Sequence, residues 1–523
     1  MTQVEILFER YGPKYQWLVT LTVLLGLVAL GMSITIVNVA TPYIKGAFGM
    51  SADQVQWLST GFLAATTVAL LVAPWLVSAF GQRATYIGLL AVFIAASFLG
   101  GTATGMGAII ASRIIQGAMT GLVRPVALEA LFAVYPPSQR GMATAMYGMS
   151  LGLPLTLATV IGGWLVDTYN WRYVFFIVPP ICLAAIVMGY YFLPPRESRG
   201  PRPAFDWFGA TSLFIAIFAL LAALSNGQRW GWNSGGVVGL ISFSLAIGTL
   251  FILWERRVEK PLVDLAIFAN KGFLMGAICL FLFGGAFYAI MYLLPDFVQG
   301  VLHYDPITAG KLFLPSTLVL GILVPLVGKL SDRMRPHYLT LPGLAFAIFA
   351  VYRMAHVDWH TSFASLATSM ALLSVGMAAF PPPTLSRAIA SLPPKLIGYG
   401  SGAINFALQL GGAFGTAALV TMMDRRTLFH SDNLTAGLNA GNAVAMHTLA
   451  ELHAAAAAVG TNAMYQQIAS LRAIGKIDGL WASIFAFQDG FWAVVAALVL
   501  VAIPSWLLSR WAGWSGDSDT NKG

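Results

Sequence analysis

Three charged residues stand inside one long apolar segment, residues 107–134, and they are the chain's first candidates for chemistry. Arg124 and Glu129 lie in the run VRPVALEALF, and Arg113 precedes Arg124 by eleven positions. An ionised side chain inside a membrane-spanning segment is costly and marks a functional site by default. A carboxylate there can take up and release a proton, and a guanidinium can bind an anion. We therefore interpret Glu129, Arg124 and Arg113 as candidates for proton coupling.

Helical geometry predicts the directions in which the three charged side chains point. Eleven residues of an ideal helix place Arg113 and Arg124 about 20° apart, so both are expected to face one central cavity, with Glu129 roughly 140° away. Pro125 can bend the helix and change that separation. Arg113 could instead snorkel to the headgroups, and Glu129 could pair with a neighbouring helix or reach the cytoplasmic surface. A fourth candidate, Asp489, stands at the outer start of the last apolar segment, where it could equally be a structural cap.

The elements that carry these residues are long apolar runs separated by short polar stretches. The chain has 523 residues, of which 58% are hydrophobic and only 10% are charged, and its mean hydropathy is +0.76. About twenty consecutive apolar residues cross the roughly 30 Å hydrocarbon core as a helix. The pattern predicts an all-α integral membrane protein. The predicted segments are residues 17–42, 57–78, 84–104, 107–134, 141–166, 172–194, 207–226, 235–254, 273–298, 307–328, 338–356, 366–386, 397–423 and 483–508.

The distribution of charge predicts the orientation of these segments, and proline-bearing linkers divide them into groups. About two-thirds of the 29 lysines and arginines fall on the side of the chain ends, which predicts that both termini are cytoplasmic. The loop at 424–481 then faces outward, and its alanine-rich part from Leu449 to Leu471 predicts a helical hairpin over the outer surface. The expected divisions are an N-terminal six-helix bundle at 1–198, a two-helix insert at 199–265, a C-terminal six-helix bundle at 266–514 and a disordered tail at 515–523.

A short charged motif, GKLSDRMR at residues 328–335, follows the tenth apolar segment. Gly328 lets two helices approach, and the Asp332 carboxylate can hold Arg333 or another arginine at a helix end. The motif resembles the conformational loop signature of the major facilitator superfamily, which recurs between the second and third helices of each half. Its first-half counterpart at 73–83, APWLVSAFGQR, lacks the acid. A loop whose charges only set topology is the alternative.

Glycines in two further motifs predict close helix packing. Gly117 and Gly121 form a small-xxx-small pair in SRIIQGAMTGLVRP, where Arg113 and a glutamine match the superfamily's arginine motif. Gly162 and Gly163 keep part of the glycine-proline signature of drug antiporters, although the Gly-Pro expected just before them is absent. These glycines could pack helices without any part in exchange.

Four weaker strings occur in a consistent order, namely TIVNVATP, RVEKPLVDLAIF, SGAINFALQLGGAFGTA and FAFQDGF. With the fourteen segments they resemble EmrB/QacA-type drug:proton antiporters, and the EmrB branch most, over nearly the whole chain. The resemblance implies a major facilitator fold in the cell inner membrane. It also implies proton-driven export of a small amphiphile by alternating access, with a periplasmic adaptor protein and an outer-membrane channel as partners. A stand-alone exporter, or a proton-coupled importer of one small metabolite, is the alternative.

Departures from the family pattern bear on mechanism. The first segment has Ser33 where the family usually has an acid, and the thirteenth has Leu408 where it usually has an arginine. Arg124 and Glu129 stand where the pattern is uncharged. Two cavity-facing arginines without the usual acid favour an organic acid or fatty acid over a lipophilic cation. The polar points expected in the substrate cavity are Asn38, Gln116, Asn405 and Gln409.

Other functions find little support in the residue types. An enzyme at the membrane would need clustered His, Asp or Cys near one interface, so we expect no catalytic site and no cofactor. Cys182 and Cys279 both lie in apolar segments, and His356 and His360 occupy a short loop without further ligands, so no metal is expected. The positive residues are scattered among loops, which argues against nucleic acid as a partner.

Overall fold

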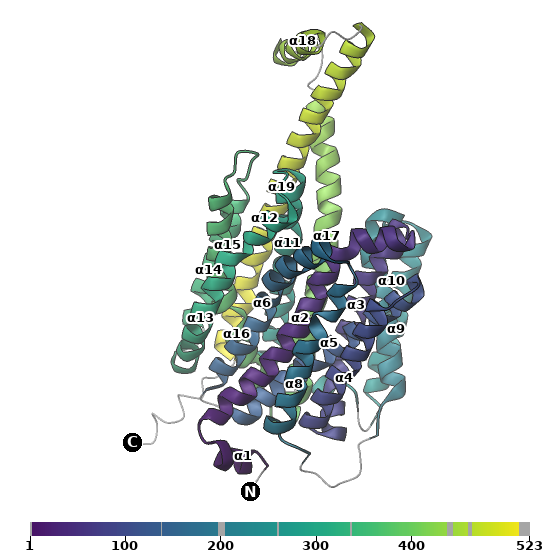
Figure 1. Ribbon diagram of the computed structural model, residues 1–523. Helices are drawn as coiled ribbons and strands as arrows, with labels where there is room; N and C mark the ends of the chain where they lie inside the picture. Colours follow the sequence, from purple (N-terminus) through teal and green to yellow (C-terminus); the bar gives the residue numbers. More distant parts are fainter. Residues whose placement is uncertain are drawn as a thin grey trace.

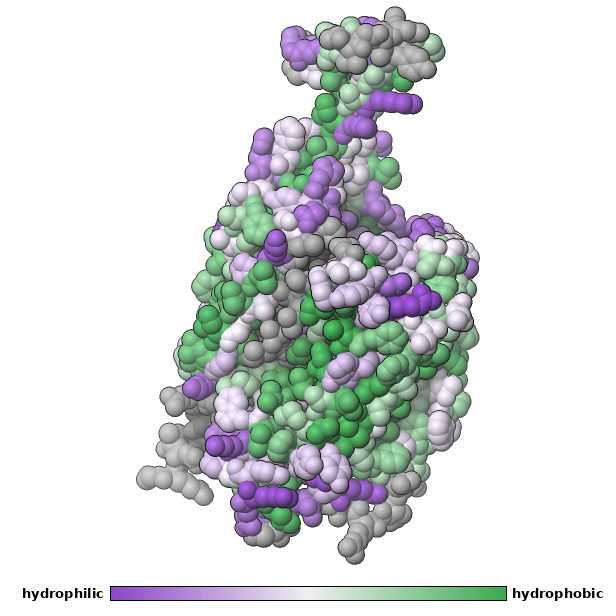
Figure 2. Space-filling view, in the orientation of Figure 1, coloured by the Kyte–Doolittle hydropathy of each residue, from purple (hydrophilic) through white to green (hydrophobic). Residues whose placement is uncertain are grey.

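The computed structural model describes residues 3–136, 139–196, 204–258, 261–334, 337–436, 443–458 and 463–511. Within these residues every regular element is an α-helix or a 3-10 helix, most of them packed side by side in one bundle (Figure 1). Hydrophobic side chains cover much of the bundle, whereas hydrophilic ones gather at its two ends and along a projecting part (Figure 2). The predicted all-α membrane fold is confirmed.

The first half of the chain forms eight helices, two of which are short. Their bounds are α1 Gln3–Tyr11, α2 Lys14–Phe48, α3 Ala52–Phe80, α4 Gln82–Gly101, α5 Met106–Val134, α6 Arg140–Thr168, α7 Tyr173–Phe176 and α8 Val178–Phe192. Two helices follow between the halves, α9 Trp207–Trp230 and α10 Gly235–Glu255.

The second half begins after a 3-10 turn. Its elements are η2 Leu265–Ala269, α11 Lys271–Gly300, α12 Pro306–Lys311, α13 Phe313–Arg333, α14 His337–Met354, α15 Phe363–Ala379, α16 Pro381–Ala390, η3 Pro394–Leu396, α17 Ile397–Ala436, α18 Ala443–Ala458 and α19 Ala463–Trp511. Among the described residues, 12 helical stretches are long and apolar enough to cross a membrane. The fifth and eleventh predicted segments are not among these stretches but are occupied by α6, with 29 residues, and α14, with 18.

Glycines let the helices of each half approach backbone to backbone. A Cβ on Gly117 or Gly121 of α5 would collide with the carbonyl oxygens of Phe62 and Thr66 on α3. The Thr66 hydroxyl donates to the Gly117 carbonyl oxygen at 2.9 Å. Gly411 of α17 lies in the same way against the Phe281 carbonyl of α11. Small residues permit this approach because they have little or no side chain. Close packing matters here because lipid supplies no hydrophobic drive between helices.

The two halves meet most closely near the end of the bundle that carries α1, the start of α6 and the end of α13. We call this end the terminal face, and the opposite end the distal face. A Cβ on Gly328 of α13 would lie 2.8 Å from the Met142 sulfur of α6. On the other side of the bundle, a Cβ on Gly402 of α17 would lie 2.8 Å from the Leu70 carbonyl oxygen of α3. Small residues therefore seal the halves together toward the terminal face.

The helices α9 and α10 form a pair at the side of the bundle. Trp57 of α3 stacks on Phe218 of α9 with ring centroids 5.5 Å apart. The α10 helix packs on α9, where the Ser244 hydroxyl donates to the Ala216 carbonyl oxygen at 2.7 Å. The α9 helix thus joins the pair to α3 of the bundle, and its assignment as an insert between two six-helix bundles stays a prediction.

The most distinct departure from expectation is a stalk formed by α17 and α19 on the distal face (Figure 1). These helices have 40 and 49 residues, and at 1.5 Å per residue they are about 60 Å and 73 Å long, well beyond a bilayer core. The predicted helices of the loop at 424–481 are present, but their predicted position over the outer surface is wrong. The α18 helix stands away from the bundle at the end of the stalk because the two spans continue as unbroken helices.

Candidate functional site

A cluster of polar side chains joins the two halves in the interior. Arg124 of α5 is only 9% exposed, and its Nη1 donates to Oε1 of Gln409 on α17 at 3.3 Å. The Tyr288 hydroxyl of α11 donates to the same oxygen at 3.0 Å. Nearby, the Tyr147 hydroxyl of α6 donates to Oδ1 of Asn405 on α17 at 2.8 Å. We call these five residues the bridging cluster.

The charge of the bridging cluster is unbalanced. The neutral amide oxygen of Gln409 accepts from Arg124, and no ion pair of Arg124 is found within the part of the chain that the structure describes. A buried cation without a counter-charge is costly and favours binding of an anion. Since two hydrogen bonds of the cluster run between the halves, they must break if the halves separate here. The arrangement suits a site that binds a small anion between two moving bodies.

Arg113 occupies a different environment from Arg124. Its guanidinium is 1% exposed and donates to Ser33 Oγ at 3.2 Å, to the Ser33 carbonyl oxygen at 3.1 Å and to the Leu58 carbonyl oxygen at 3.2 Å. It also lies over the Phe62 ring at 4.3 Å. All these partners belong to α2 and α3 of the first half. The expectation that both arginines face one cavity is therefore wrong for Arg113, and so is the snorkelling alternative.

Gln116 and Ser33 complete the surroundings of Arg113. Gln116 Oε1 accepts from Arg113 Nη1 at 2.9 Å, and its Nε2 donates to Ser97 Oγ at 2.9 Å. Gln116 is 1% exposed, so it packs inside the first half and does not line the cavity that we expected. Ser33 stands directly against Arg113, at the position where EmrB/QacA-type antiporters usually have an acid. Among the described residues, this second guanidinium also has no counter-charge.

Glu129 lies further along α5 toward the terminal face and lines a cavity of about 320 Å³. Asp206, before α9, and Lys395, in η3, line the same cavity, together with Trp75 of α3 and Tyr399 of α17. No hydrogen bond or ion pair of the Glu129 side chain is found among the described residues, although part of that side chain is buried. A half-buried carboxylate without a cation partner is well suited to exchange a proton.

The remaining predicted residues are spread through the bundle. Asn38 is exposed, and its Oδ1 accepts from Ser59 Oγ at 3.0 Å. Gly162 of α6 faces Ile36 of α2, where a Cβ would lie 2.8 Å from that side chain, and Gly163 is buried. The side chains of Asp332 and Arg333 lie outside the described residues, so the structure tests only the position of the loop motif at the end of α13.

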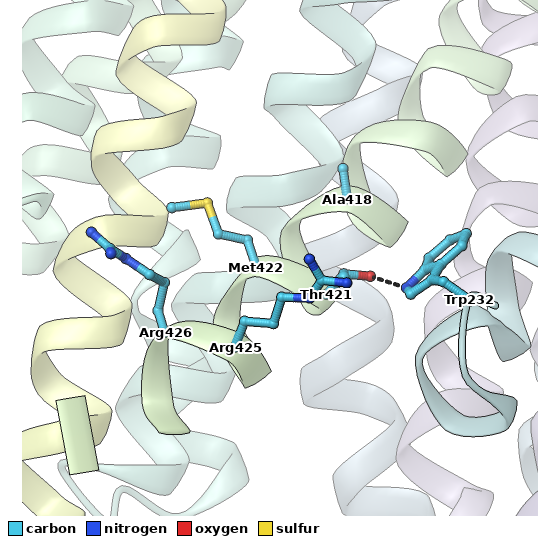
Figure 3. Close-up of a pocket in the computed structure, with 6 residues that line it drawn as sticks. All are labelled: Trp232, Ala418, Thr421, Met422, Arg425 and Arg426. Carbon is cyan, nitrogen blue, oxygen red and sulfur yellow. Dashed lines mark hydrogen bonds between the residues drawn. The ribbon is translucent and has the colours of Figure 1, made fainter. Parts of the chain in front are cut away.

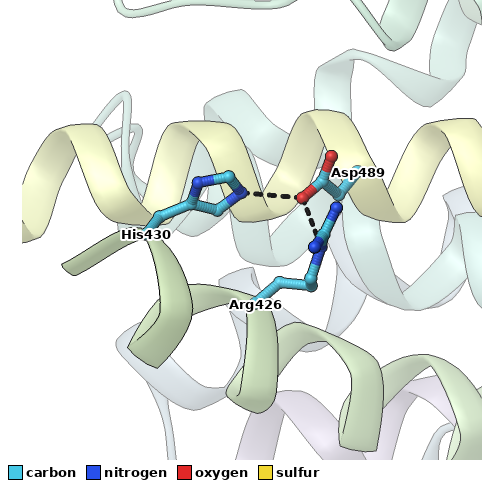
Figure 4. Close-up of polar contacts among 3 residues, drawn as sticks. All are labelled: Arg426, His430 and Asp489. Carbon is cyan, nitrogen blue, oxygen red and sulfur yellow. Dashed lines mark hydrogen bonds and ion pairs between the residues drawn. The ribbon is translucent and has the colours of Figure 1, made fainter. Parts of the chain in front are cut away.

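Asp489 fastens the base of the stalk (Figure 4). Its Oδ2 accepts from Arg426 Nε at 2.7 Å and lies 2.7 Å from Nε2 of His430, both on α17. This carboxylate thus ties α19 to α17 on the distal side. This geometry indicates a structural role, but not the predicted cap, because Asp489 lies inside α19 rather than at its start.

Sequence reasoning missed the two tyrosines of the bridging cluster. Tyr147 and Tyr288 stand in apolar runs, where an aromatic ring is expected for packing alone. The feature that could have identified them is the hydroxyl, because a buried tyrosine hydroxyl usually finds a hydrogen-bond partner. Only the fold shows that this partner lies in the other half for Tyr147.

Comparison with known proteins agrees with this architecture. The pattern described as Major Facilitator Superfamily matches residues 23–416. The multidrug export protein EmrB of Escherichia coli strain K12 is 28% identical over 474 residues, covering 90% of this chain and 92% of the relative. The fatty acid resistance protein FarB of Neisseria gonorrhoeae is 28% identical, covering 84% of this chain and 87% of the relative. The tetracenomycin C resistance and export protein of Streptomyces glaucescens is 29% identical, covering 78% and 76%.

Solved structures show the same fold at lower identity. A double tryptophan mutant of XylE superposes with a TM-score of 0.62 at 14% identity, over 95% of this chain and 96% of the other. The human organic anion transporter MFSD10 superposes with a TM-score of 0.55 at 17% identity, over 92% and 99%.

We expect Asp489→Asn to loosen the attachment of α19 to α17 at the base of the stalk. Loss of the charge weakens both contacts to α17, so amide hydrogen exchange around His430 should rise about two- to fivefold. Amide hydrogen exchange measured by mass spectrometry tests this prediction. The control is Asp432→Asn, which removes an exposed charge from α17, the helix that carries His430, and should leave the rate unchanged. Loss of pH-gradient-driven transport in Asp489→Asn would instead support the proton-coupling interpretation of this residue.

Proposed function

Since the chain belongs to the major facilitator superfamily and is therefore a membrane transporter related to efflux proteins, we propose that it exports small amphiphilic molecules in exchange for protons. The bridging cluster carries this proposal. Hydrogen bonds from Arg124 to Gln409 and from Tyr147 to Asn405 cross between the halves, as they would at a site that opens alternately to each side. In this proposal the substrate replaces these bonds when it enters.

The charge of the cluster favours an anionic substrate. The Arg124 guanidinium donates to the neutral amide oxygen of Gln409, and a carboxylate would bind it more strongly than this amide does. The tyrosine rings and the surrounding apolar helices suit the rest of an amphiphile. The name of the FarB relative refers to fatty acid resistance, which supports organic acids and fatty acids as the substrate class.

Glu129 is the proposed proton carrier. It lies five residues, or about 7.5 Å of helix, from Arg124, and its cavity adjoins the terminal face. We propose that this face is cytoplasmic, as the distribution of lysine and arginine indicates. A proton taken up from the far side would then leave through this cavity, past Lys395. Arg113 would hold α2, α3 and α5 together so that the first half moves as one body.

Transport by purified protein in liposomes with an imposed pH gradient tests the coupling. We expect Glu129→Gln to reduce gradient-driven transport at least tenfold, because the amide cannot carry a proton, while exchange of substrate without a gradient persists. Glu451→Gln on α18 removes an exposed carboxylate and should transport normally. Equal gradient-driven rates in Glu129→Gln and wild type would contradict the assignment. Accumulation on the side of the higher proton concentration shows export, and the reverse shows uptake.

Arg124→Ala tests the substrate class. A charge-assisted hydrogen bond contributes roughly 1.5–3 kcal/mol, so its loss should lower transport of an organic acid relative to an organic cation about tenfold or more. Arg124→Lys keeps the charge and should retain much of the preference. An acid-to-cation ratio that is unchanged in Arg124→Ala, measured with dodecanoate and dodecyltrimethylammonium, would contradict an anionic substrate.

The stalk suggests how the transporter is used in the cell. We propose that α18 and the adjoining ends of α17 and α19 contact a periplasmic adaptor protein, which would link this chain to an outer-membrane channel. The EmrB resemblance supports this assembly, and so does the length of the stalk beyond the bundle. We expect an adaptor to copurify with the full chain in mild detergent but not with a variant lacking residues 437–462. Copurification that is equal with both would contradict contact through the stalk, and transport by the chain alone in cells would favour a stand-alone exporter.

A further inference from the structure

A second cavity, of about 540 Å³, opens on the distal face between α17 and the connection of α9 with α10 (Figure 3). We call it the distal pocket. Six residues line it, namely Trp232, Ala418, Thr421, Met422, Arg425 and Arg426. It is separate from the bridging cluster and from the cavity of Glu129, and the proposed function uses none of these six residues.

Trp232 forms one fixed wall of the distal pocket. The chain leaves α9 through Gly231, whose φ of 85° lies in the left-handed region that favours glycine. The Trp232 indole then packs over Gly227, where a Cβ would lie 2.6 Å from the ring, and its Nε1 donates to Thr421 Oγ1 at 2.9 Å. The ring is therefore held between the α9–α10 pair and α17.

The distal pocket lies at the depth of a membrane boundary. Thr421 comes 24 residues after the start of α17 at Ile397, which corresponds to about 36 Å of helix, slightly more than the hydrocarbon core of about 30 Å. Tryptophan and arginine are common at this depth, where apolar chains and charged headgroups meet. A ligand here can keep its tail in an apolar region and its head in water.

The pocket carries an unpaired positive charge. Arg426 is engaged with Asp489, whereas Arg425 is exposed and has no ion pair within the residues described. The neighbouring acid, Asp424, lies near Asp296 of α11. Its side chain is therefore on the side of α17 that faces α11, away from Arg425. Apolar surface is supplied by Trp232, across the pocket from α17, and by Ala418 and Met422 on α17 itself.

From this geometry we infer that the distal pocket is a binding site for an amphiphilic anion. The carboxylate or phosphate group of the ligand contacts Arg425, and its alkyl or aromatic part lies against Trp232 and Met422. Guanidinium groups bind both headgroups through paired N–H donors. The ligand is either a free organic acid or a membrane phospholipid. This inference goes beyond the proposed function, because it holds whether or not the bridging cluster binds an acid.

Photolabelling of the full-length protein in phosphatidylcholine nanodiscs tests the site. The probe is a twelve-carbon fatty acid with a diazirine on its tail, and labelled peptides are identified by mass spectrometry. We expect labelling of the peptides that contain Trp232 and residues 418–422, reduced about fivefold in Arg425→Ala and partly retained in Arg425→Lys. The control, Arg472→Ala, removes an exposed arginine from α19 and should label like wild type. Thermal unfolding confirms that each variant is folded.

Competition separates the possible results. Excess dodecanoate should abolish the labelling, and dodecyltrimethylammonium should not. Equal labelling of wild type and Arg425→Ala, equal competition by the cation, or an unlabelled pocket would overturn the inference. Phosphatidylglycerol in the nanodisc should suppress labelling if the natural ligand is a phospholipid, and should have no effect if it is a free acid. Persistent pocket labelling in Arg124→Ala, with transport lost, separates this site from the bridging cluster.

Discussion

Burial of the Arg124 guanidinium between the two halves is the constraint around which the interior of this protein is arranged. In a medium of low dielectric constant a cation must find partners, and here the nearest acceptor, Gln409, belongs to the other half. A neutral amide satisfies the hydrogen bond but leaves the charge uncompensated. The contact between the halves is therefore specific, yet weaker than an ion pair would be. In the proposed alternating-access mechanism, breaking this contact leaves no buried carboxylate behind.

Two arginines on one helix illustrate how environment, rather than residue type, assigns a role. Arg113 is enclosed by α2 and α3, with carbonyl and hydroxyl oxygens around it and an aromatic ring beneath it. It holds three helices of one half together. Arg124 instead reaches Gln409 of α17, in the second half. Arg113 thus stabilises contacts within one half, whereas Arg124 lies at the contact between the halves.

The sequence alone could predict only part of this arrangement. Apolar runs located the spans, since hydrocarbon tolerates little else, and a buried charge singled out α5. A helical wheel gave the angle between Arg113 and Arg124 but not which helix stands opposite each. Likewise, the end of an apolar run at 423 predicted where the membrane ends, not where the helix ends. The backbone of α17 continues to Ala436 because polar residues can extend a helix into water.

The continuous helices of the stalk also make it a lever. About twenty residues of α19 precede its apolar part, which corresponds to roughly 30 Å of helix outside the bilayer. A tilt of the second half by about 10° would move the far end of such a rod by roughly 5 Å. Because α19 runs without a break from the span into its extension, a rearrangement of the second half around Arg124 would displace the far end of the stalk. Under the proposed alternating-access mechanism, the position of α18 would therefore follow the orientation of the second half.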